Sequence, residues 1–216
     1  MMTRAVIFDL DGTLLDTLED LADSCNVVLA QLGFPTRTYD EIRQFVGNGL
    51  TRLMELALPG GKGNGRFDEC LNLLRTIYAA NCQRKTKPYR GVLELLGKLR
   101  QRGVRCAVVS NKPDAQVKSL CRAYFAPFVD ECCALGDAEG RRRKPAADMV
   151  LQVMSVLGVQ LDEAVYVGDS EVDLQTAKNA GLLCVTATWG FRDEAFLLRQ
   201  GATALAHTPE DVLRYL

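Results

Sequence analysis

Two aspartates one residue apart, Asp9 and Asp11, follow the first apolar run of the chain. If that run is a strand, its period of two places both carboxylates on the same side. Carboxylates so close repel one another unless a cation or a shared proton compensates. Gly12, which comes next, permits a sharp turn and the close approach of a ligand to the backbone. The pattern indicates a site for a cation or for acid–base chemistry, although Asp-Gly is also common in plain turns.

Three further polar groups follow apolar runs later in the chain. Ser110 and the backbone amides after it, beginning with Asn111, can donate hydrogen bonds to a phosphate. Lys144 provides a mobile positive charge. Asp169 and Asp173 add carboxylate oxygens, which are ligands of the kind that Mg²⁺ takes. Each group alone has a plainer explanation, such as a helix cap for the serine or a solvated basic loop for the lysine.

The elements that must position these residues alternate along the chain. Five short apolar runs, rich in β-branched residues, predict strands: Ala5–Leu10, Val104–Val109, Val129–Leu135, Ala164–Gly168 and Leu183–Ala187. Amphipathic patterns predict helices between most of them: Val92–Arg102, Pro113–Ala123, Ala147–Leu157 and Leu174–Ala180. Nearly continuous apolar strands that alternate with helices indicate an α/β fold with a buried parallel sheet. Ligands of such sheets bind beyond the carboxyl ends of the strands, where the polar residues gather.

One long segment breaks this alternation. Residues 16 to about 86 contain no convincing strand pattern, and their apolar spacing predicts three or four helices. The oxygens of Asp16 and Thr17, with Glu19 and Asp20 three positions on, predict a capping box at the start of the first helix. We therefore expect an α/β core of residues 1–15 and 87–216, with a helical insert of residues 16–86.

The composition excludes several classes of partner. The chain has 216 residues and a formal net charge of −1, so neither sign of charge would attract nucleic acid or an anionic membrane surface. It has no apolar run of the ~20 residues that a membrane helix needs, and its first residues lack the pattern of a signal peptide. Eight cysteines without a C-x-x-C pair predict reduced thiols and a cytoplasmic location.

Taken in order, the four polar groups resemble the motifs of the haloacid dehalogenase superfamily, and the resemblance covers essentially the whole chain. Within it the sequence is most similar to the phosphoglycolate phosphatase group, on the strength of Ala5–Leu14, Val46–Gly49 and Thr188–Phe191. The family has a Rossmann-like parallel sheet with a small helical cap inserted after the first motif. Ala147 stands where relatives often carry a second proline, a departure that should affect only the start of the next helix.

The resemblance implies a role for each residue. Asp9 would attack phosphorus and carry an aspartyl-phosphate, while Asp11 would act as general acid and then general base. Mg²⁺ would be held by Asp9, the Asp11 main-chain carbonyl and Asp169, with Asp173 as a ligand or a support. The residues implied to contact the phosphoryl group are Gly12, Thr13, Ser110, Asn111 and Lys144, and those implied to contact substrate from the cap are Asn48 and Gly49.

The expected activity is the Mg²⁺-dependent hydrolysis of a small phosphorylated metabolite, with 2-phosphoglycolate as the leading substrate. A pyrophosphatase or a sugar-phosphate mutase of the same superfamily would keep both aspartates. A regulatory module that binds a phosphorylated ligand without turnover is an alternative from another class, because fold alone does not fix function. The sequence leaves open whether the protein is a monomer or a homodimer.

Overall fold

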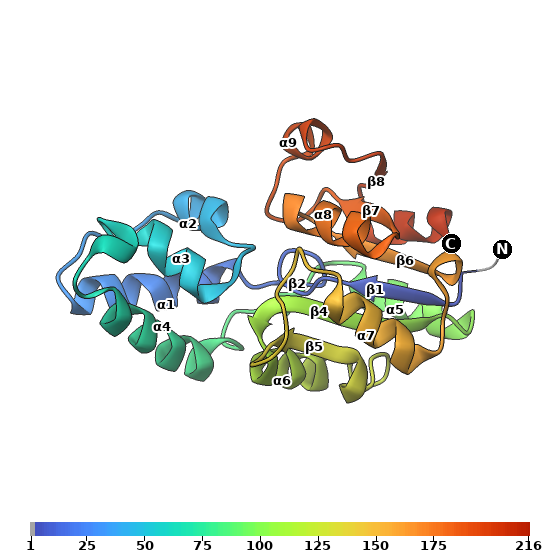
Figure 1. The fold of residues 1–216 in the computed structure, drawn as a ribbon, viewed down its shortest axis with the longest axis horizontal. Coiled ribbons are helices and arrows are strands. Elements are labelled where there is room, and N and C mark those ends of the chain that lie inside the picture. Colours follow the sequence, from blue (N-terminus) through green and yellow to red (C-terminus); the bar gives the residue numbers. More distant parts are fainter. Residues whose placement is uncertain (1–2) are drawn as a thin grey trace. The chain divides into compact units, whose positions relative to one another are not determined.

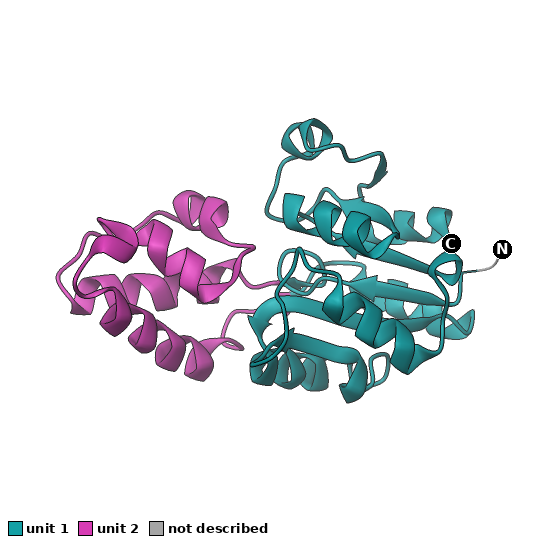
Figure 2. Ribbon diagram, viewed as in Figure 1, with its two compact units in different colours: residues 1–15, 88–216 teal, residues 16–87 magenta. Residues whose placement is uncertain are grey.

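The chain folds into two compact units. The structure, a computed structural model, describes residues 3–216. One unit joins the segment up to Leu15 with Pro88–Leu216, and the other is Asp16–Lys87, coloured teal and magenta in Figure 2. The connecting segments, β2 (Leu15–Asp16) and β3 (Lys87–Pro88), pair as a two-stranded sheet.

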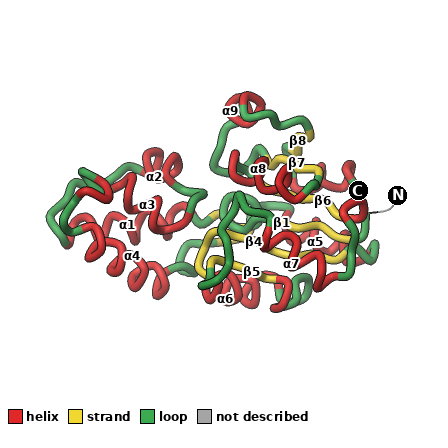
Figure 3. Tube along the Cα trace, in the orientation of Figure 1, coloured by secondary structure: helices red, strands yellow, loops and turns green. Residues whose placement is uncertain are grey.

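The first unit is built on a parallel sheet of six strands. Their spatial order is β5 (Ala134–Asp137), β4 (Arg105–Pro113), β1 (Ala5–Phe8), β6 (Ala164–Gly168), β7 (Leu183–Ala187) and β8 (Ala204–Ala206). Helices alternate with these strands along the chain (Figures 1 and 3). The predicted α/β fold with a parallel sheet is therefore confirmed.

The central strand β1 is buried along its whole length, as its unbroken apolar sequence predicts. Phe8 lies beside Val108 of β4 on one side and Val167 of β6 on the other. Because all three strands are parallel, the residues that follow each of them emerge at the same edge of the sheet. This register brings Asp9 to the edge that also carries the polar residues at the end of β4 and after β6.

Apart from the short helix α9 (Glu194–Arg199), the described part of this unit has four α-helices: α5 (Val92–Gln101), α6 (Asp114–Phe125), α7 (Asp148–Leu157) and α8 (Glu171–Ala180). Their apolar faces join the strands in one core, in which Leu96, Phe125 and Val153 are fully buried. Burial of such side chains contributes roughly 1.5–3 kcal/mol each. The core thus holds the carboxyl edge of the sheet in place.

Two predictions about these elements were wrong. The strand predicted over Val129–Leu135 begins only at Ala134, because Glu131–Cys133 forms a turn of 3₁₀ helix. Val129 and Cys133 are nevertheless buried, so the apolar pattern reported burial and not extended backbone. The helix predicted from Leu174 begins at Glu171. Strand β8 and helix α9 were not predicted, since each is too short to show a period.

The second unit consists of helices, as predicted for the insert. They are α1 (Leu18–Gln31), α2 (Tyr39–Phe45), α3 (Gly49–Ala57) and α4 (Phe67–Asn81), with a short 3₁₀ turn at Gly61–Gly63. Helices α1 and α4 pack side by side. Within residues 3–216, we find no helix that combines the length and apolarity needed to cross a membrane.

The capping box predicted at the start of α1 was also wrong. Thr17 occupies the N-cap position without a side-chain hydrogen bond to the helix. The Asp20 carboxylate instead accepts hydrogen bonds from the amides of Lys85 and Thr86 and from the Thr86 hydroxyl, at 2.8–3.0 Å. The Asp20 carboxylate thus forms these long-range hydrogen bonds in place of the local cap. They hold Lys85 and Thr86, near the end of the second unit, against its first helix.

Candidate active site

Three carboxylates meet at the carboxyl edge of the sheet. Asp9 follows β1, and its amide continues the ladder by donating to the carbonyl of Val167 at 2.8 Å. Asp169 follows β6, and Asp173 lies in the first turn of α8. One oxygen from each of Asp9, Asp169 and Asp173 lies within 4.8 Å of the other two, and all three residues are buried. The structure thus brings these three predicted residues together.

Lys144 lies against this cluster. Its Nζ is 2.7 Å from Asp9 Oδ1 and 2.8 Å from Asp173 Oδ1, and it donates to the Tyr166 hydroxyl at 3.2 Å. Burial alone would lower the pKa of Lys144, but the charges of Asp173 and Asp9 outweigh it and raise the pKa above its ordinary value. The lysine is therefore a fixed positive charge beside the Asp9 carboxylate.

The carboxylates are in an environment that disfavours their charge. Burial raises the pKa of Asp9 well above its ordinary value, Lys144 opposes this, and Asp173 and Asp169 raise it further. Burial and then the charge of Asp173 raise the pKa of Asp169 to about 7, although the Phe191 amide and the Thr13 hydroxyl lower it. A cation bound to these oxygens would remove the repulsion.

The donor set fits a hard divalent cation such as Mg²⁺. Four carboxylates lie at this edge, those of Asp9, Asp11, Asp169 and Asp173. Within the described residues, the salt bridges that involve them use two ammonium groups, those of Lys112 and Lys144. A divalent cation would balance the charges, and oxygen ligands of this type are the ones that Mg²⁺ prefers.

Asp169 and Asp173 differ in their capacity to bind such a cation. Each Asp169 oxygen accepts one hydrogen bond, from the Thr13 hydroxyl or the Phe191 amide, which leaves lone pairs for a ligand. Asp173 Oδ1 accepts from Lys144 and Tyr166, and Oδ2 accepts from the amide and the hydroxyl of Ser170. A carboxylate with four donors is suited to positioning Lys144, and it has little capacity left for a metal.

Asp11 lies outside the group of three carboxylates. Its Oδ1 is 2.8 Å from Nζ of Lys112, whose side chain is 2% exposed. Sequence reasoning missed Lys112, although it directly follows Ser110 and Asn111 at the end of an apolar strand. That placement is the signal that could have identified it.

The predicted phosphate-binding residues make contacts with the protein itself. Gly12 has a φ of +86°, and a Cβ there would lie 2.4 Å from Asp169 Oδ2, so only glycine lets this turn approach the carboxylate. Its amide donates to the Leu15 carbonyl, and the Thr13 hydroxyl donates to Asp169. Both residues therefore shape the Asp169 site.

The last residues of β4 support the same edge. Ser110 is buried, and its Oγ accepts from the amide of Lys112 at 3.2 Å. Asn111 Nδ2 donates to the Lys144 carbonyl at 3.1 Å, which ties the loop of the lysine to β4. Asn48 and Gly49 lie in the second unit, where Asn48 is the N-cap residue of α3 and both are half-buried.

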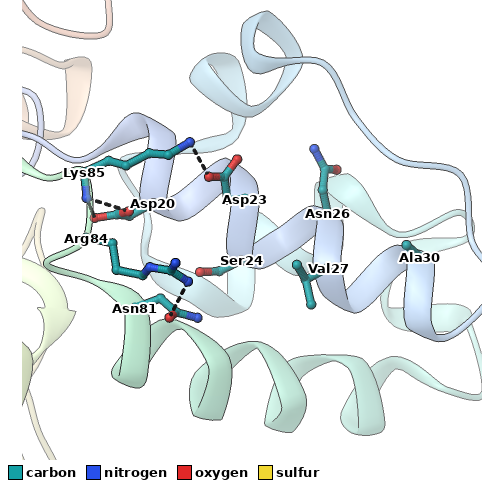
Figure 4. Close-up of a pocket in the computed structure, with 9 residues that line it drawn as sticks. All are labelled: Asp20, Asp23, Ser24, Asn26, Val27, Ala30, Asn81, Arg84 and Lys85. Atoms are coloured by element: carbon teal, nitrogen blue, oxygen red, sulfur yellow. Dashed lines mark hydrogen bonds and ion pairs between the residues drawn. The ribbon is translucent and has the colours of Figure 1, made fainter.

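A separate cavity of about 660 Å³ lies within the second unit, between α1 and the end of α4 (Figure 4). It contains none of the site residues predicted from the sequence. Its two cationic side chains already have partners, since Lys85 pairs with Asp23 and Arg84 donates to the side-chain oxygen of Asn81. The cavity therefore presents no converging set of groups for a phosphate.

Comparison with known proteins decides the family. The model of the family "Haloacid dehalogenase-like hydrolase" matches residues 6–187. The chain belongs to this family. The superfamily membership inferred from the four motifs is thus confirmed, and the matched region includes the whole carboxylate cluster and Lys144.

Relatives of this haloacid dehalogenase-like hydrolase carry a common name. Phosphoglycolate phosphatase 1 of Pseudomonas aeruginosa is 31% identical, over 98% of this chain and 79% of its own. Phosphoglycolate phosphatase of Rhodospirillum rubrum is 34% identical, over 89% of this chain and 83% of its own. A solved structure from Lactobacillus delbrueckii subsp. bulgaricus is 36% identical with a TM-score of 0.92, and the match covers 100% of this chain and 98% of that one.

We expect stabilisation by Mg²⁺ to grow from about pH 6 to about pH 8. In the metal-free protein, the folded-state pKa of Asp169 is raised to about 7, so the folded state keeps a proton that the unfolded state releases. The stability that this proton contributes is present at low pH and is lost as the pH rises to about 7. A cation that takes the place of this proton restores the stability. Thermal unfolding with and without MgCl₂ measures the effect, and Asp169→Asn should remove it. A shift independent of pH, or one retained in Asp169→Asn, would contradict this placement of the metal.

Proposed function

We propose that this hydrolase is a Mg²⁺-dependent phosphatase that hydrolyses a small phosphomonoester, with 2-phosphoglycolate as the leading substrate. The observation that carries the proposal is the buried Asp9 carboxylate, held by Lys144 beside two further carboxylates. The names of the relatives support the substrate class. The choice among small esters needs a direct assay.

In the proposed first step, a carboxylate oxygen of Asp9 attacks phosphorus and the bond between phosphorus and the ester oxygen breaks. The ester oxygen takes a proton from Asp11 and leaves as an alcohol. In the second step, a water molecule gives a proton to Asp11 and its oxygen attacks phosphorus, which releases inorganic phosphate and restores Asp9. Asp11 thus donates a proton in the first step and accepts one in the second, while Asp9 gains the phosphoryl group and then loses it.

Lys144 would stabilise the negative charge of the transferred group, and the buried hydroxyl of Ser110 would donate to one of its oxygens. Asp173 would hold Lys144 in position through the contact at 2.8 Å. Bound Mg²⁺, held by Asp9, the Asp11 carbonyl and Asp169, would neutralise charge and orient the phosphoryl group. The helical unit would act as a cap that selects the leaving group, with Asn48 and Gly49 as its contacts.

We further propose a cytoplasmic location, supported by eight free cysteines, most of them buried. The partner is then a small phosphorylated metabolite.

A panel of phosphate esters tests the proposal. We expect Mg²⁺-dependent release of phosphate from 2-phosphoglycolate that exceeds release from sugar phosphates, nucleoside monophosphates and pyrophosphate. Omission of Mg²⁺ is the control. Isomerisation of a sugar phosphate without net release would indicate a mutase. Binding of an ester without any turnover, in the presence of Mg²⁺, would indicate a regulatory module.

A further inference from the structure

Tyr166 is a buried tyrosine that the proposed chemistry does not yet use. It lies in the middle of β6, three residues before Asp169, and it is fully buried. A buried phenolic hydroxyl needs hydrogen-bond partners, because leaving it unpaired away from water is costly. The partners of this hydroxyl are the two charged side chains beside Asp9, those of Lys144 and Asp173. The hydroxyl therefore belongs to the active-site edge of the sheet.

The Tyr166 hydroxyl bridges Asp173 and Lys144. It donates to Asp173 Oδ1 at 2.8 Å and accepts from Nζ of Lys144 at 3.2 Å. The same Nζ also donates to Asp173 Oδ1, at 2.8 Å. Gly168 lets α8 lie this close to β6, since a Cβ there would come within 2.3 Å of Cβ and Cγ of Asp173. The hydroxyl, the ammonium group and the carboxylate oxygen thus form a closed triangle of contacts.

The ammonium group of Lys144 has three acceptors, which match its three donors. Two of them are carboxylate oxygens, from Asp9 at 2.7 Å and from Asp173 at 2.8 Å, and the third is the Tyr166 hydroxyl. A lysine side chain is flexible, so a single acceptor would leave its charge free to move. Three acceptors that come from β1, β6 and α8 define the position of Nζ.

One of these three acceptors changes during the proposed reaction. When Asp9 becomes an acyl phosphate, its carboxylate loses its negative charge, and its attraction for Lys144 weakens. The charge of Asp173 would then draw the ammonium group away from Asp9. The Tyr166 hydroxyl opposes this movement, because it accepts from Lys144 and also donates to the Asp173 oxygen that Lys144 contacts. The ammonium group therefore stays beside the phosphoryl group through both steps.

We propose that Tyr166 is a positioning residue, whose hydroxyl holds the ammonium group of Lys144 beside the transferred phosphoryl group. The proposal rests on the proposed phosphatase function and adds a residue to it. Tyr166 acts through Lys144, and no bond to the tyrosine is made or broken during turnover. Its loss should therefore slow the reaction without abolishing it, in contrast to the loss of Asp9.

The variant Tyr166→Phe removes the hydroxyl and keeps the ring in the core. We expect kcat for 2-phosphoglycolate to fall about tenfold, because a small displacement of a group that acts on the transition state is costly. The change in KM should be much smaller. Tyr215→Phe is the matched control, since the Tyr215 hydroxyl donates to the Leu205 carbonyl at 2.8 Å in the same unit. It should leave kcat and KM unchanged, and thermal unfolding checks that both variants fold.

A double-mutant cycle with Lys144→Met tests whether the hydroxyl acts through the lysine. Adding Tyr166→Phe to Lys144→Met should cost no further kcat, because the ammonium group that the hydroxyl holds is already absent. An equal loss in both backgrounds would overturn the inference, since it would mean that the hydroxyl only supports the fold. Native kcat in Tyr166→Phe would overturn it too. A native protein that hydrolyses no ester would overturn the proposed function, and the inference with it.

Discussion

Replacement of Asp9 with asparagine is expected to abolish Mg²⁺-dependent phosphate release. Loss of a covalent nucleophile reduces kcat by about a thousandfold or more. The substitution keeps the size of a residue that is 7% exposed, so the fold should persist. It also removes a carboxylate whose pKa is raised first by burial and then, against the opposing charge of Lys144, by the charges of Asp173 and Asp169. Asp9→Asn should therefore unfold at an equal or higher temperature than the native protein.

A discontinuous phosphate assay and thermal unfolding, run on the same preparations, separate these two effects. Asp162→Asn is a matched control, because Asp162 is an exposed aspartate of the same unit. It should leave both the rate and the unfolding temperature unchanged. Native-like turnover by folded Asp9→Asn would show that the nucleophile lies elsewhere.

Lys144→Met is the second change with a large expected effect. Loss of a donor that stabilises a developing charge reduces kcat by about a hundredfold to a thousandfold. The same change leaves Asp9 and Asp173 without the ammonium group that both contact at 2.7–2.8 Å. Removing one partner of a buried ion pair costs about 3–5 kcal/mol, so we expect a clear loss in the free energy of unfolding. Urea unfolding and steady-state kinetics measure the two losses.

The double variant Lys144→Met, Asp173→Asn separates stability from catalysis. Removing the Asp173 charge should restore part of the stability that Lys144→Met loses, because the uncompensated charge disappears. It should restore no activity. Lys178→Met is the control, since Lys178 is exposed on α8, the helix that carries Asp173. Recovery of activity in the double variant would mean that Lys144 only compensates Asp173.

The ends of β1, β4 and β6 could be predicted from the sequence, because a nearly continuous apolar run comes directly before the polar residues at each of them. Asp9 and Asp169 follow β1 and β6, and the parallel register of these strands fixes their proximity. The assignment of Lys144 depended on the resemblance to a family, since a basic run alone is more often a solvated loop. Its contacts with Asp9 and Asp173 agree with that assignment, and its catalytic role stays a prediction.

The contacts that could not be predicted join residues far apart in the chain. Lys112 pairs with Asp11, and Asp20 accepts from Thr86, although each of these residues also fits a local turn or cap. A single sequence gives local preferences, and tertiary contacts decide which preference is satisfied. The same limit applies to β5, where the buried residues Val129 and Cys133 come before the strand and Cys133 belongs to a 3₁₀ turn. For this reason the roles of Gly12 and Thr13 around Asp169 also became clear only from the structure.

The most direct test of the central claim is to trap phosphate on Asp9. Native protein with Mg²⁺ is mixed with 2-phosphoglycolate that carries a radiolabelled phosphoryl group, quenched in acid within a single turnover and digested. The account predicts label on the peptide that contains Asp9, with no label when Mg²⁺ is omitted or in Asp9→Asn. Rapid hydrolysis with label on another peptide would contradict an aspartyl-phosphate formed on Asp9.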